Sequence, residues 1–298
     1  MNKYISSRRT VIKSLASTAG VSLIAGMNSR ISAAENVLTK GIKGNINHSV
    51  CKWCYKDIEL EDLAKAAVEI GLDSIELLGI KDFDMLKKYG LKCAMVSGGG
   101  GEYSISNAWN KRENHEGLLE RYMMQIDETS KAGFENIICF SGNRFDNLGD
   151  EQGLENCTEG LQKLMSHAEK RNVTVVMELL NSKVNHPNYM CDHTDWGVEL
   201  CKKIGSDKFK LLYDIYHMQI MEGDVIRTIQ ENHSYIAHYH TGGVPGRNEI
   251  DDTQELYYPA IMKAILETGY KGHIGQEFIP KREDKLASLK QGVNICDV

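Results

Sequence analysis

The segment VTVVME at residues 173–178 and the segment FKLLYD at residues 209–214 share one pattern. Each is an apolar run of strand length that ends in an acidic residue, as buried strands of parallel sheets often do. The pattern recurs downstream, and the four apolar runs are Val173–Met177, Phe209–Tyr213, Tyr235–Tyr239 and His273–Gln276. Parallel strands need a long crossover, usually a helix, so runs spaced by about one βα unit predict adjacent parallel strands.

A polar residue directly follows each of the four runs. These residues are Glu178, Asp214, His240 and Glu277, at separations of 36, 26 and 37 positions. Because parallel strands end at one rim of their sheet, we expect the four side chains to converge there. Three carboxylates and an imidazole suit Mn²⁺ or Mg²⁺ and can also bind Zn²⁺, Co²⁺ or Fe²⁺. A helix N-cap or loop residue is the alternative for any one of them, but the shared position of all four favours a metal site.

The rest of the chain alternates strand-like and helix-like runs. Upstream strands are predicted at Ile46–Val50, Ser74–Leu78, Lys92–Ser97 and Asn136–Phe140. Helices are predicted at Leu60–Ile70, Phe83–Tyr89, Glu113–Ala132, Gly153–Lys170, Thr194–Ile204, Asp224–Glu231 and Leu256–Thr268. Eight strands alternating with helices predict an α/β fold, the (β/α)₈ TIM barrel, with an open doubly wound sheet as the alternative. In the barrel, active sites lie at the C-terminal ends of the strands.

Two predicted loops, Leu180–Asp192 and Thr241–Asp252, are longer than most βα loops, which is typical of substrate loops or lids. The glycine run Gly98–Gly101 after the third strand allows the backbone to approach a ligand. Neither a GxGxxG after the first strand nor the Lys-Ser/Thr of a phosphate loop is present, so we expect no dinucleotide site.

The composition is that of an ordinary globular protein: 298 residues, 42% hydrophobic and 26% charged, with a net charge of −6. A (β/α)₈ barrel occupies about 250 residues, so residues 35–298 are predicted to form a single catalytic domain. No cluster of Lys and Arg lies beyond the N-terminus, which argues against nucleic acid as a partner.

Residues 1–34 are predicted to be an export signal. Residues 7–13 read SRRTVIK, which resembles a twin-arginine signal, and a weakly apolar stretch follows at Ser14–Met27. Small residues at 32–34 fit cleavage before Glu35. The apolar stretch is too short and too polar for a stable membrane span, so we expect a periplasmic protein with no span after processing. An unstructured basic tail is the alternative.

Eight cysteines are present, and two of them form a CxxC at Cys51 and Cys54. The spacing is not that of a small disulfide-stapled domain, and Cys93 and Cys139 lie in apolar strand-like runs. We expect mostly free thiols and leave a pairing of Cys51 with Cys54 open.

Four motifs resemble the hydroxypyruvate isomerase family, which belongs to the xylose-isomerase-like TIM barrels. They read ELLN at 178–181, YDIYHMQ at 213–219, VPGRNE at 244–249 and GQEF at 275–278. The likeness is strong over residues 173–280, and upstream it is a matter of pattern alone. The second motif, with the MEGD that follows it, is the most diagnostic.

The resemblance implies isomerisation of an α-hydroxy carbonyl through an enediolate. A divalent metal that chelates both substrate oxygens would stabilise the charge. By similarity, Glu178 and Glu277 would be the acid–base pair as well as metal ligands, with Asp214 a further ligand.

Substrate contacts are also implied by the resemblance. His217 would contact a substrate oxygen, with a core-facing histidine as the alternative. Arg247 would bind a carboxylate or hydroxyls, with a solvated loop arginine as the alternative. Asn181 and His186 lie in the long loop, and Glu249 could orient Arg247 or His217. Three aromatic residues near early strands could cover a sugar face: Trp53, Tyr103 and Trp109.

The chain departs from the family pattern at His240, where hydroxypyruvate isomerases often have Gln and ketose 3-epimerases have a metal-binding His. Two enzyme predictions therefore stay open: conversion of hydroxypyruvate to tartronate semialdehyde, and action on a ketose or a 3-keto sugar. The expected partner is a small sugar or hydroxy-keto acid, and a homo-oligomer is left open. A non-catalytic sugar-binding protein is the alternative of another class, and an endonuclease of the same superfamily fits less well.

Overall fold

A curled sheet of seven parallel strands lies at the centre of the computed structural model, which describes residues 42–145 and 148–298. In chain order the strands are β1 (Asn47–Cys51), β2 (Ser74–Glu76), β3 (Asn136–Cys139), β4 (Thr174–Glu178), β5 (Phe209–Asp214), β6 (Ile236–Thr241) and β7 (His273–Gln276). Their order in the sheet is β2-β1-β7-β6-β5-β4-β3. Pairing of the first strand with the last is what curls the sheet toward a barrel.

Residues 92–97 bridge the remaining gap between β2 and β3. The prediction of a regular strand there is wrong, because the segment forms only single parallel bridges to its two neighbours. Side chains take over part of its hydrogen bonding. The backbone N–H of Ala94 donates to Ser74 Oγ at 2.8 Å, and Asn136 Nδ2 donates to the Ala94 carbonyl at 2.9 Å. The bridges still join β2 to β3, so the predicted barrel architecture is confirmed.

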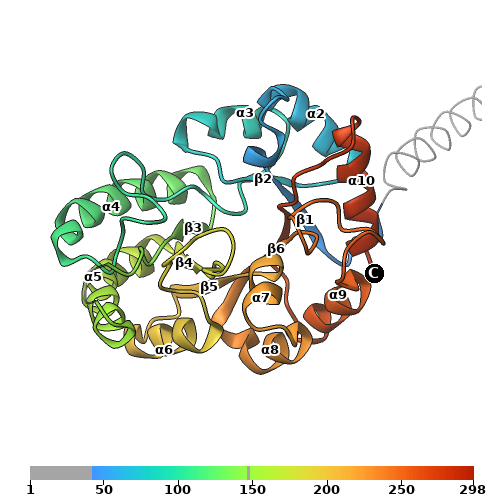
Figure 1. The fold of residues 1–298 in the computed structure, drawn as a ribbon. Coiled ribbons are helices and arrows are strands. Elements are labelled where there is room, and N and C mark those ends of the chain that lie inside the picture. The colour runs from blue at the N-terminus through green and yellow to red at the C-terminus, as the bar shows by residue number, and fades with distance from the viewer. Residues whose placement is uncertain (1–41, 146–147) are drawn as a thin grey trace, which may run out of the picture. The chain divides into compact units, whose positions relative to one another are not determined.

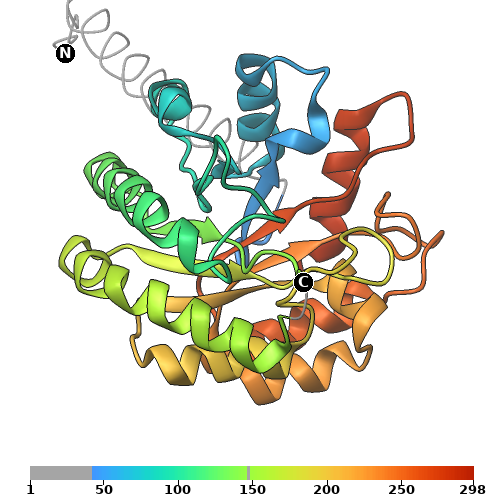
Figure 2. The same cartoon turned by 60° about the vertical axis from the view of Figure 1, so that its left-hand side comes forward.

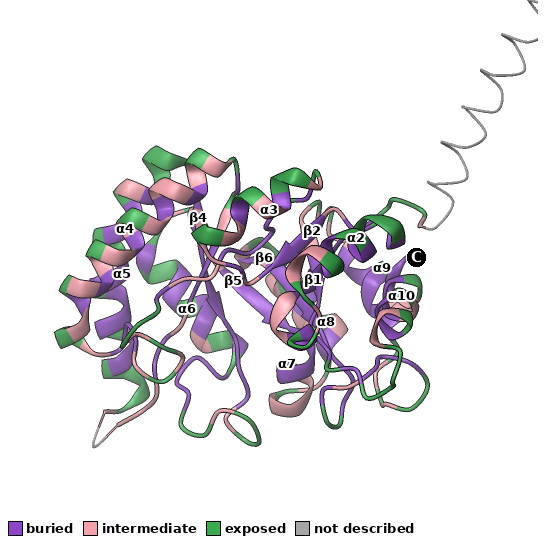
Figure 3. Ribbon diagram, turned by 90° about the horizontal axis from the view of Figure 1, so that it is seen from above, coloured by how far each residue is buried: buried purple, intermediate pink, exposed green. Residues whose placement is uncertain are grey.

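Helices surround the strands of residues 43–298 (Figure 1), and a turned view shows them packed along the outside of the sheet (Figure 2). They are α2 (Leu60–Ile70), α3 (Phe83–Lys88), α4 (His115–Ala132), α5 (Asp150–Arg171), α6 (Thr194–Ile204), α7 (Ile215–Met221), α8 (Val225–Asn232), α9 (Tyr258–Glu267) and α10 (Lys285–Cys296). Their outer faces are exposed while the strands are buried (Figure 3).

Helix α2 shows why the spacing of apolar residues predicts helices correctly in this chain. It buries residues at helical spacing, including Leu63, Ala67 and Ile70. It ends at Gly71, whose φ of 99° suits a residue without a Cβ and whose N–H bonds the Ala67 carbonyl. The predicted bounds of α2 and α6 are confirmed to the residue.

Helices α7 and α10 were not predicted. Four consecutive residues of α7 are buried, from Ile215 to Met218, so the helix has no apolar stripe of period 3.6. The buried face of α10 includes Ser288 and Gly292, which weakens its apolar signal. In both, tertiary packing outweighs the local pattern.

The barrel interior holds an apolar cluster formed by Met95, Ile138, Val176 and Leu212. Gly98 is required beside it, because a Cβ there would lie 1.9 Å from the Ile138 carbonyl oxygen. All eight cysteines are buried, and no disulfide joins them in the described part of the chain. No helix among the described residues is long and apolar enough to cross a membrane. The predicted export signal at 1–34 lies outside the described residues.

Candidate metal centre

The four side chains predicted to bind a metal meet at the C-terminal rim of the barrel. Glu178 and Asp214 are the last residues of β4 and β5, His240 is the penultimate residue of β6, and Glu277 follows β7. Their ligand atoms all lie within 4.8 Å of one another, and all four residues are buried. The expected convergence is present.

His240 turns its Nδ1 toward the carboxylates. This atom lies 2.7 Å from Glu277 Oε2 and 3.6 Å from Glu178 Oε1. Despite the short distance, Nδ1 has no partner of hydrogen-bonding geometry among the residues that the structure describes. A buried ring nitrogen that faces carboxylates without a hydrogen bond is an arrangement that a metal ion satisfies.

Asp214 has two roles at once. Its Oδ1 accepts a hydrogen bond from the backbone N–H of His217 at 3.2 Å and so caps the N-terminus of α7. The capping alternative therefore holds for this residue. Its other oxygen, Oδ2, faces the cluster and accepts from Arg247 Nη2 at 2.9 Å.

Crowding of charge perturbs the ionisation of the cluster. Burial raises the pKa of Asp214 to about 8 and also raises the pKa of Glu178. Burial would raise the pKa of Glu277 too, but Arg247 and His240 hold it well below its usual range. Burial would lower the pKa of His240, but the neighbouring Glu277 carboxylate raises it above its usual range.

The guanidinium of Arg247 lies within the cluster, so the alternative of a solvated loop arginine is wrong. Besides its bond to Asp214, Nη2 donates to Glu277 Oε2, and Nε donates to the Glu277 carbonyl at 3.2 Å. The guanidinium carbon lies 5.2 Å from the Trp53 ring centroid and 5.3 Å from that of Tyr216. Two aromatic faces and two carboxylates thus fix its position.

His217 is buried, but it is not an inert core residue. Its Nδ1 accepts from the backbone N–H of Asn181 at 3.0 Å. Nε2 lies 3.6 Å from Asp214 Oδ2 and 3.0 Å from Arg247 Nη1, which can only donate, so both ring nitrogens face donors at the edge of the cluster. Burial lowers the pKa of His217 well below its usual value, so the ring is neutral.

The remaining predicted residues lie further from the cluster. Asn181 contacts both its own loop and His217: its Oδ1 accepts from the backbone N–H groups of Val184 and Asn185, and its Nδ2 lies 2.6 Å from His217 Nδ1. His186 lines the cavity beside the cluster. The proposed orienting role of Glu249 is not supported, because its Oε1 instead accepts from two backbone N–H groups at 281 and 282 and from a serine at 288.

A cavity of about 430 Å³ opens beside the cluster. Its polar lining residues are Trp53, Ser97, Glu178, His186, Arg247 and Glu277. Its other lining residues are Leu77, Gly98, Ile105, Ile138, Phe140 and Leu180. A ligand here would meet both charged groups and hydrocarbon.

Of the aromatic residues considered from the sequence, Trp53 alone lines this cavity. It lies in the short 3-10 helix Lys52–Tyr55 after β1, and its Nε1 donates to Glu277 Oε1 at 2.7 Å. Trp109 is fully buried against Tyr122, and Tyr103 stacks on Arg121. The prediction that Tyr103 and Trp109 cover a sugar is therefore not supported.

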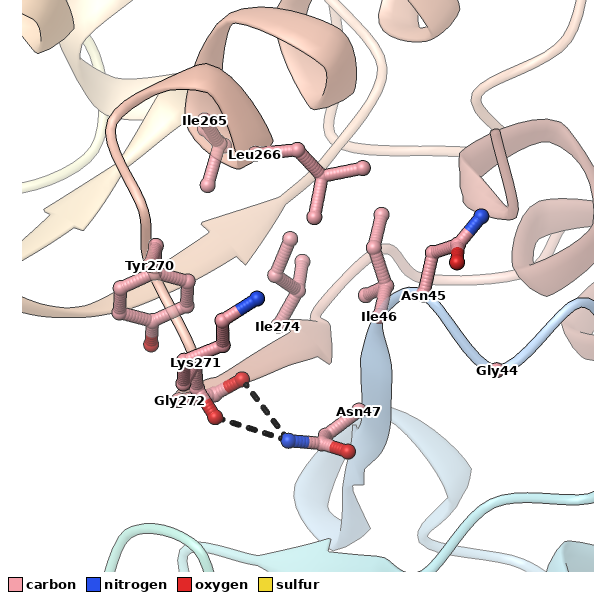
Figure 4. A pocket seen from close by; sticks show the side chains of 10 residues that line it. All are labelled: Gly44, Asn45, Ile46, Asn47, Ile265, Leu266, Tyr270, Lys271, Gly272 and Ile274. Carbon is pink, nitrogen blue, oxygen red and sulfur yellow. Dashed lines mark hydrogen bonds between the residues drawn. The ribbon is translucent and has the colours of Figure 1, made fainter.

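A second cavity, of about 370 Å³, lies at the opposite end of the barrel (Figure 4). It is formed where β1 and β7 begin, and Asn47 Nδ2 donates there to the Lys271 carbonyl at 2.8 Å. Its lining contains no carboxylate, histidine or cysteine, so it offers none of the chemistry of the first cavity.

Sequence reasoning missed a polar group behind the cluster. Glu76 ends β2 and is fully buried, with His238, His240 and Cys51 around its carboxylate. The one signal was a charged residue inside the apolar strand run 74–78. Cys51, Glu76 and His240 are close enough to share an ion, but a 2.6 Å hydrogen bond joins Glu76 to His240, and burial raises the pKa of the Cys51 thiol.

Residues 64–295 match the family described as Xylose isomerase-like TIM barrel. The chain belongs to this family, which confirms the resemblance seen in the motifs.

Curated relatives match over shorter stretches. The 2-oxo-tetronate isomerase of Cupriavidus necator is 36% identical over 123 residues, 41% of this chain and 46% of the relative. The hydroxypyruvate isomerase of Escherichia coli is 28% identical over 149 residues, 50% of this chain and 57% of the relative. The match thus spans about half the length of these relatives.

Solved structures share the fold at low identity. An AP endonuclease of family 2 from Brucella melitensis has a TM-score of 0.71 at 20% identity, covering 82% of this chain and 97% of its own. A D-psicose 3-epimerase from Clostridium cellulolyticum H10, solved with D-tagatose, has a TM-score of 0.68 at 18% identity, covering 85% and 100%. The IOLI protein, solved with a zinc atom, has a TM-score of 0.66 at 13% identity, covering 84% and 95%.

Proposed function

We propose that this chain is a divalent-metal-dependent isomerase of a small α-hydroxy carbonyl compound, similar in reaction to hydroxypyruvate isomerase. The observation that carries the proposal is the buried cluster of Glu178, Asp214, His240 and Glu277 with Nδ1 of His240 unpaired among the described residues. Burial raises the pKa of Asp214 and of Glu178 even beside Arg247 and His240, so a further cation would stabilise the charged form of these carboxylates.

The donor set suits Mn²⁺ or Mg²⁺ best and also accepts Zn²⁺, Co²⁺ or Fe²⁺. When bound, a divalent ion would supply positive charge that stabilises the negative charge developing on the substrate oxygens. The neutral ring of His217 and the guanidinium of Arg247 would contact polar groups of the substrate beside the cluster.

Glu178 and Glu277 line the same cavity and would carry the proton. One carboxylate would remove the proton from the carbon that bears the hydroxyl, the other would return a proton to the adjacent carbon, and the hydroxyl proton would pass to the former carbonyl oxygen. The indole N–H of Trp53 fixes one oxygen of Glu277, which leaves the second oxygen facing the cluster.

Two substrate classes are supported by different observations. The relatives named 2-oxo-tetronate isomerase and hydroxypyruvate isomerase support a hydroxy-keto acid, whose carboxylate Arg247 would bind. The apolar lining residues of the cavity and the histidine at 240 support a longer neutral sugar, as for a ketose 3-epimerase or a 3-keto-sugar enzyme. A non-catalytic sugar-binding protein would not need three buried carboxylates, whose removal from water costs free energy.

The test is activity of the metal-loaded protein on hydroxypyruvate, tagatose, fructose and 3-keto-glucose. With the active substrate, Glu178→Gln and Glu277→Gln should each lower kcat by about 10²–10⁴-fold, and reaction in D₂O should label the product carbon. Glu61→Gln, on the exposed surface of α2, is the matched control and should keep full activity. Near-normal turnover by the metal-loaded Glu178 and Glu277 variants would refute the mechanism.

We also propose that the enzyme works in the periplasm after removal of residues 1–34. The support is the SRRTVIK segment with its small-residue cleavage site. Export by this route carries folded proteins, which suits an enzyme that binds its metal before leaving the cytoplasm.

A further inference from the structure

Behind the metal cluster, the carboxylate of Glu76 is enclosed by three hydrogen-bond donors. Its Oε1 lies 2.6 Å from His240 Nε2, 2.9 Å from His238 Nε2 and 3.5 Å from Cys51 Sγ. All four side chains are buried. Glu76 comes from β2 and the two histidines from β6, so the contact spans the barrel interior across β1 and β7.

The bond to Glu76 determines which nitrogen His240 presents. In the neutral form that binds a metal, an imidazole that donates from Nε2 keeps its proton there and has its lone pair on Nδ1. Nδ1 of His240 faces Glu178 and Glu277. The buried carboxylate therefore holds both the tautomer and the ring orientation that a metal ligand needs.

Gly275 of β7 makes room for this contact. A Cβ at this position would lie 2.3 Å from Glu76 Oε1 and 2.8 Å from the Cδ2 carbon of His240. A strand residue with any side chain would push the two groups apart. The absence of a side chain at Gly275 of β7 therefore leaves the space in which Glu76 and His240 meet.

His238 supports the same carboxylate from the other side. It lies two positions before His240, so both side chains point to the same face of β6, and their rings are 5.1 Å apart. Because His238 donates to the oxygen that His240 also uses, it is a second anchor for the Glu76 carboxylate.

We infer that Glu76 is a positioning residue that fixes His240 as an Nδ1 metal ligand, with Gly275 providing the space and His238 a second anchor. The inference rests on the proposed metal site. Glu76 itself does not touch the substrate cavity, whose lining excludes it. A residue that orients a ligand in this way typically changes metal affinity by about 10–100-fold when altered.

Metal affinity is the first readout. Titration calorimetry with MnCl₂ would compare the wild-type protein with Glu76→Gln, which removes the charge, and Glu76→Asp, which keeps the charge but shortens the reach. Both variants should bind Mn²⁺ about 10–100-fold more weakly. The matched control is Ser49→Ala, which removes the buried 2.9 Å hydrogen bond that joins β1 to Ser74 of β2 and should leave the Kd within about twofold of wild type.

The histidine tautomer is the second readout and needs no variant of Glu76 to fold. In ¹⁵N-histidine spectra of Zn²⁺-loaded wild-type protein, assigned by the signal lost in His240→Gln, His240 should carry its proton on Nε2 and bind zinc through Nδ1. A proton on Nδ1 would overturn the inference, and so would wild-type affinity in both Glu76 variants. Absence of metal binding by the wild type would instead refute the proposed function, and the inference with it.

Discussion

The indole N–H of Trp53 donates to Oε1 of Glu277 at 2.7 Å, which joins the turn after the first strand to the residue after the last one. The other oxygen of the same carboxylate lies 2.7 Å from His240 Nδ1. The indole therefore selects which oxygen of Glu277 faces the cluster, although the two residues are 224 positions apart.

Replacing Trp53 with Phe should lower kcat by about tenfold or more while the protein keeps its metal. Phe retains an aromatic face for Arg247 but removes the donor that orients Glu277, a loss of the size typical for groups that support a metal ligand. Steady-state kinetics and metal analysis would check this. Trp196→Phe is the control, because it loses a single hydrogen bond to the Asp150 carbonyl on the surface. Equal kcat values for the two variants would contradict the prediction.

His48 should make the protein less stable as the pH falls from about 6.5 to 4. Burial lowers its pKa from 6.5 to about 4, so in this window the unfolded chain binds a proton that the folded chain does not. Stability then falls with decreasing pH by at most about 1.4 kcal/mol per unit and levels off below pH 4. Denaturant unfolding of wild type and His48→Asn at several pH values should show the difference between the two shrinking as the pH falls. A constant difference would show that His48 does not titrate in this way.

The variant Arg8→Lys/Arg9→Lys should leave the precursor in the cytoplasm, because a twin-arginine signal depends on that residue pair. Cell fractionation with antibodies against the mature protein would detect the block. A single change of Lys13 to Arg, which keeps the pair and the charge, is the control. Normal processing and export of the double variant would rule out this route.

The sequence predicted the parts of the fold that repeat. Apolar strands followed by polar residues located Glu178, Asp214, His240 and Glu277, because parallel strands bring their ends to one rim whatever the details of the loops. The polar residues of the motif at 213–219 were equally visible, although the helix α7 that carries them was not.

The parts that depend on contacts between distant strands were missed. Glu76 looks like an ordinary charge in a short strand run, and only the barrel shows that it reaches His240, 164 positions away. Glu249 looked like a partner of Arg247 because the two are neighbours in the chain. The structure turns its carboxylate to the backbone that follows β7 instead. Residues 92–97 match a strand by composition, and Ser74 and Asn136 interrupt their pairing.

The most direct test of the account is the metal content of purified wild-type protein, Asp214→Ala and His240→Ala, measured by elemental analysis after equilibration with Mn²⁺ and removal of excess ion. Asp297→Ala is the control, because this buried carboxylate lies near His48, which belongs to the opposite end of β1 from the cluster. The account predicts about one equivalent of metal in the wild type and the control, and a loss of most of it in the two ligand variants. Equal metal content in all four proteins, or none in the wild type, would contradict it.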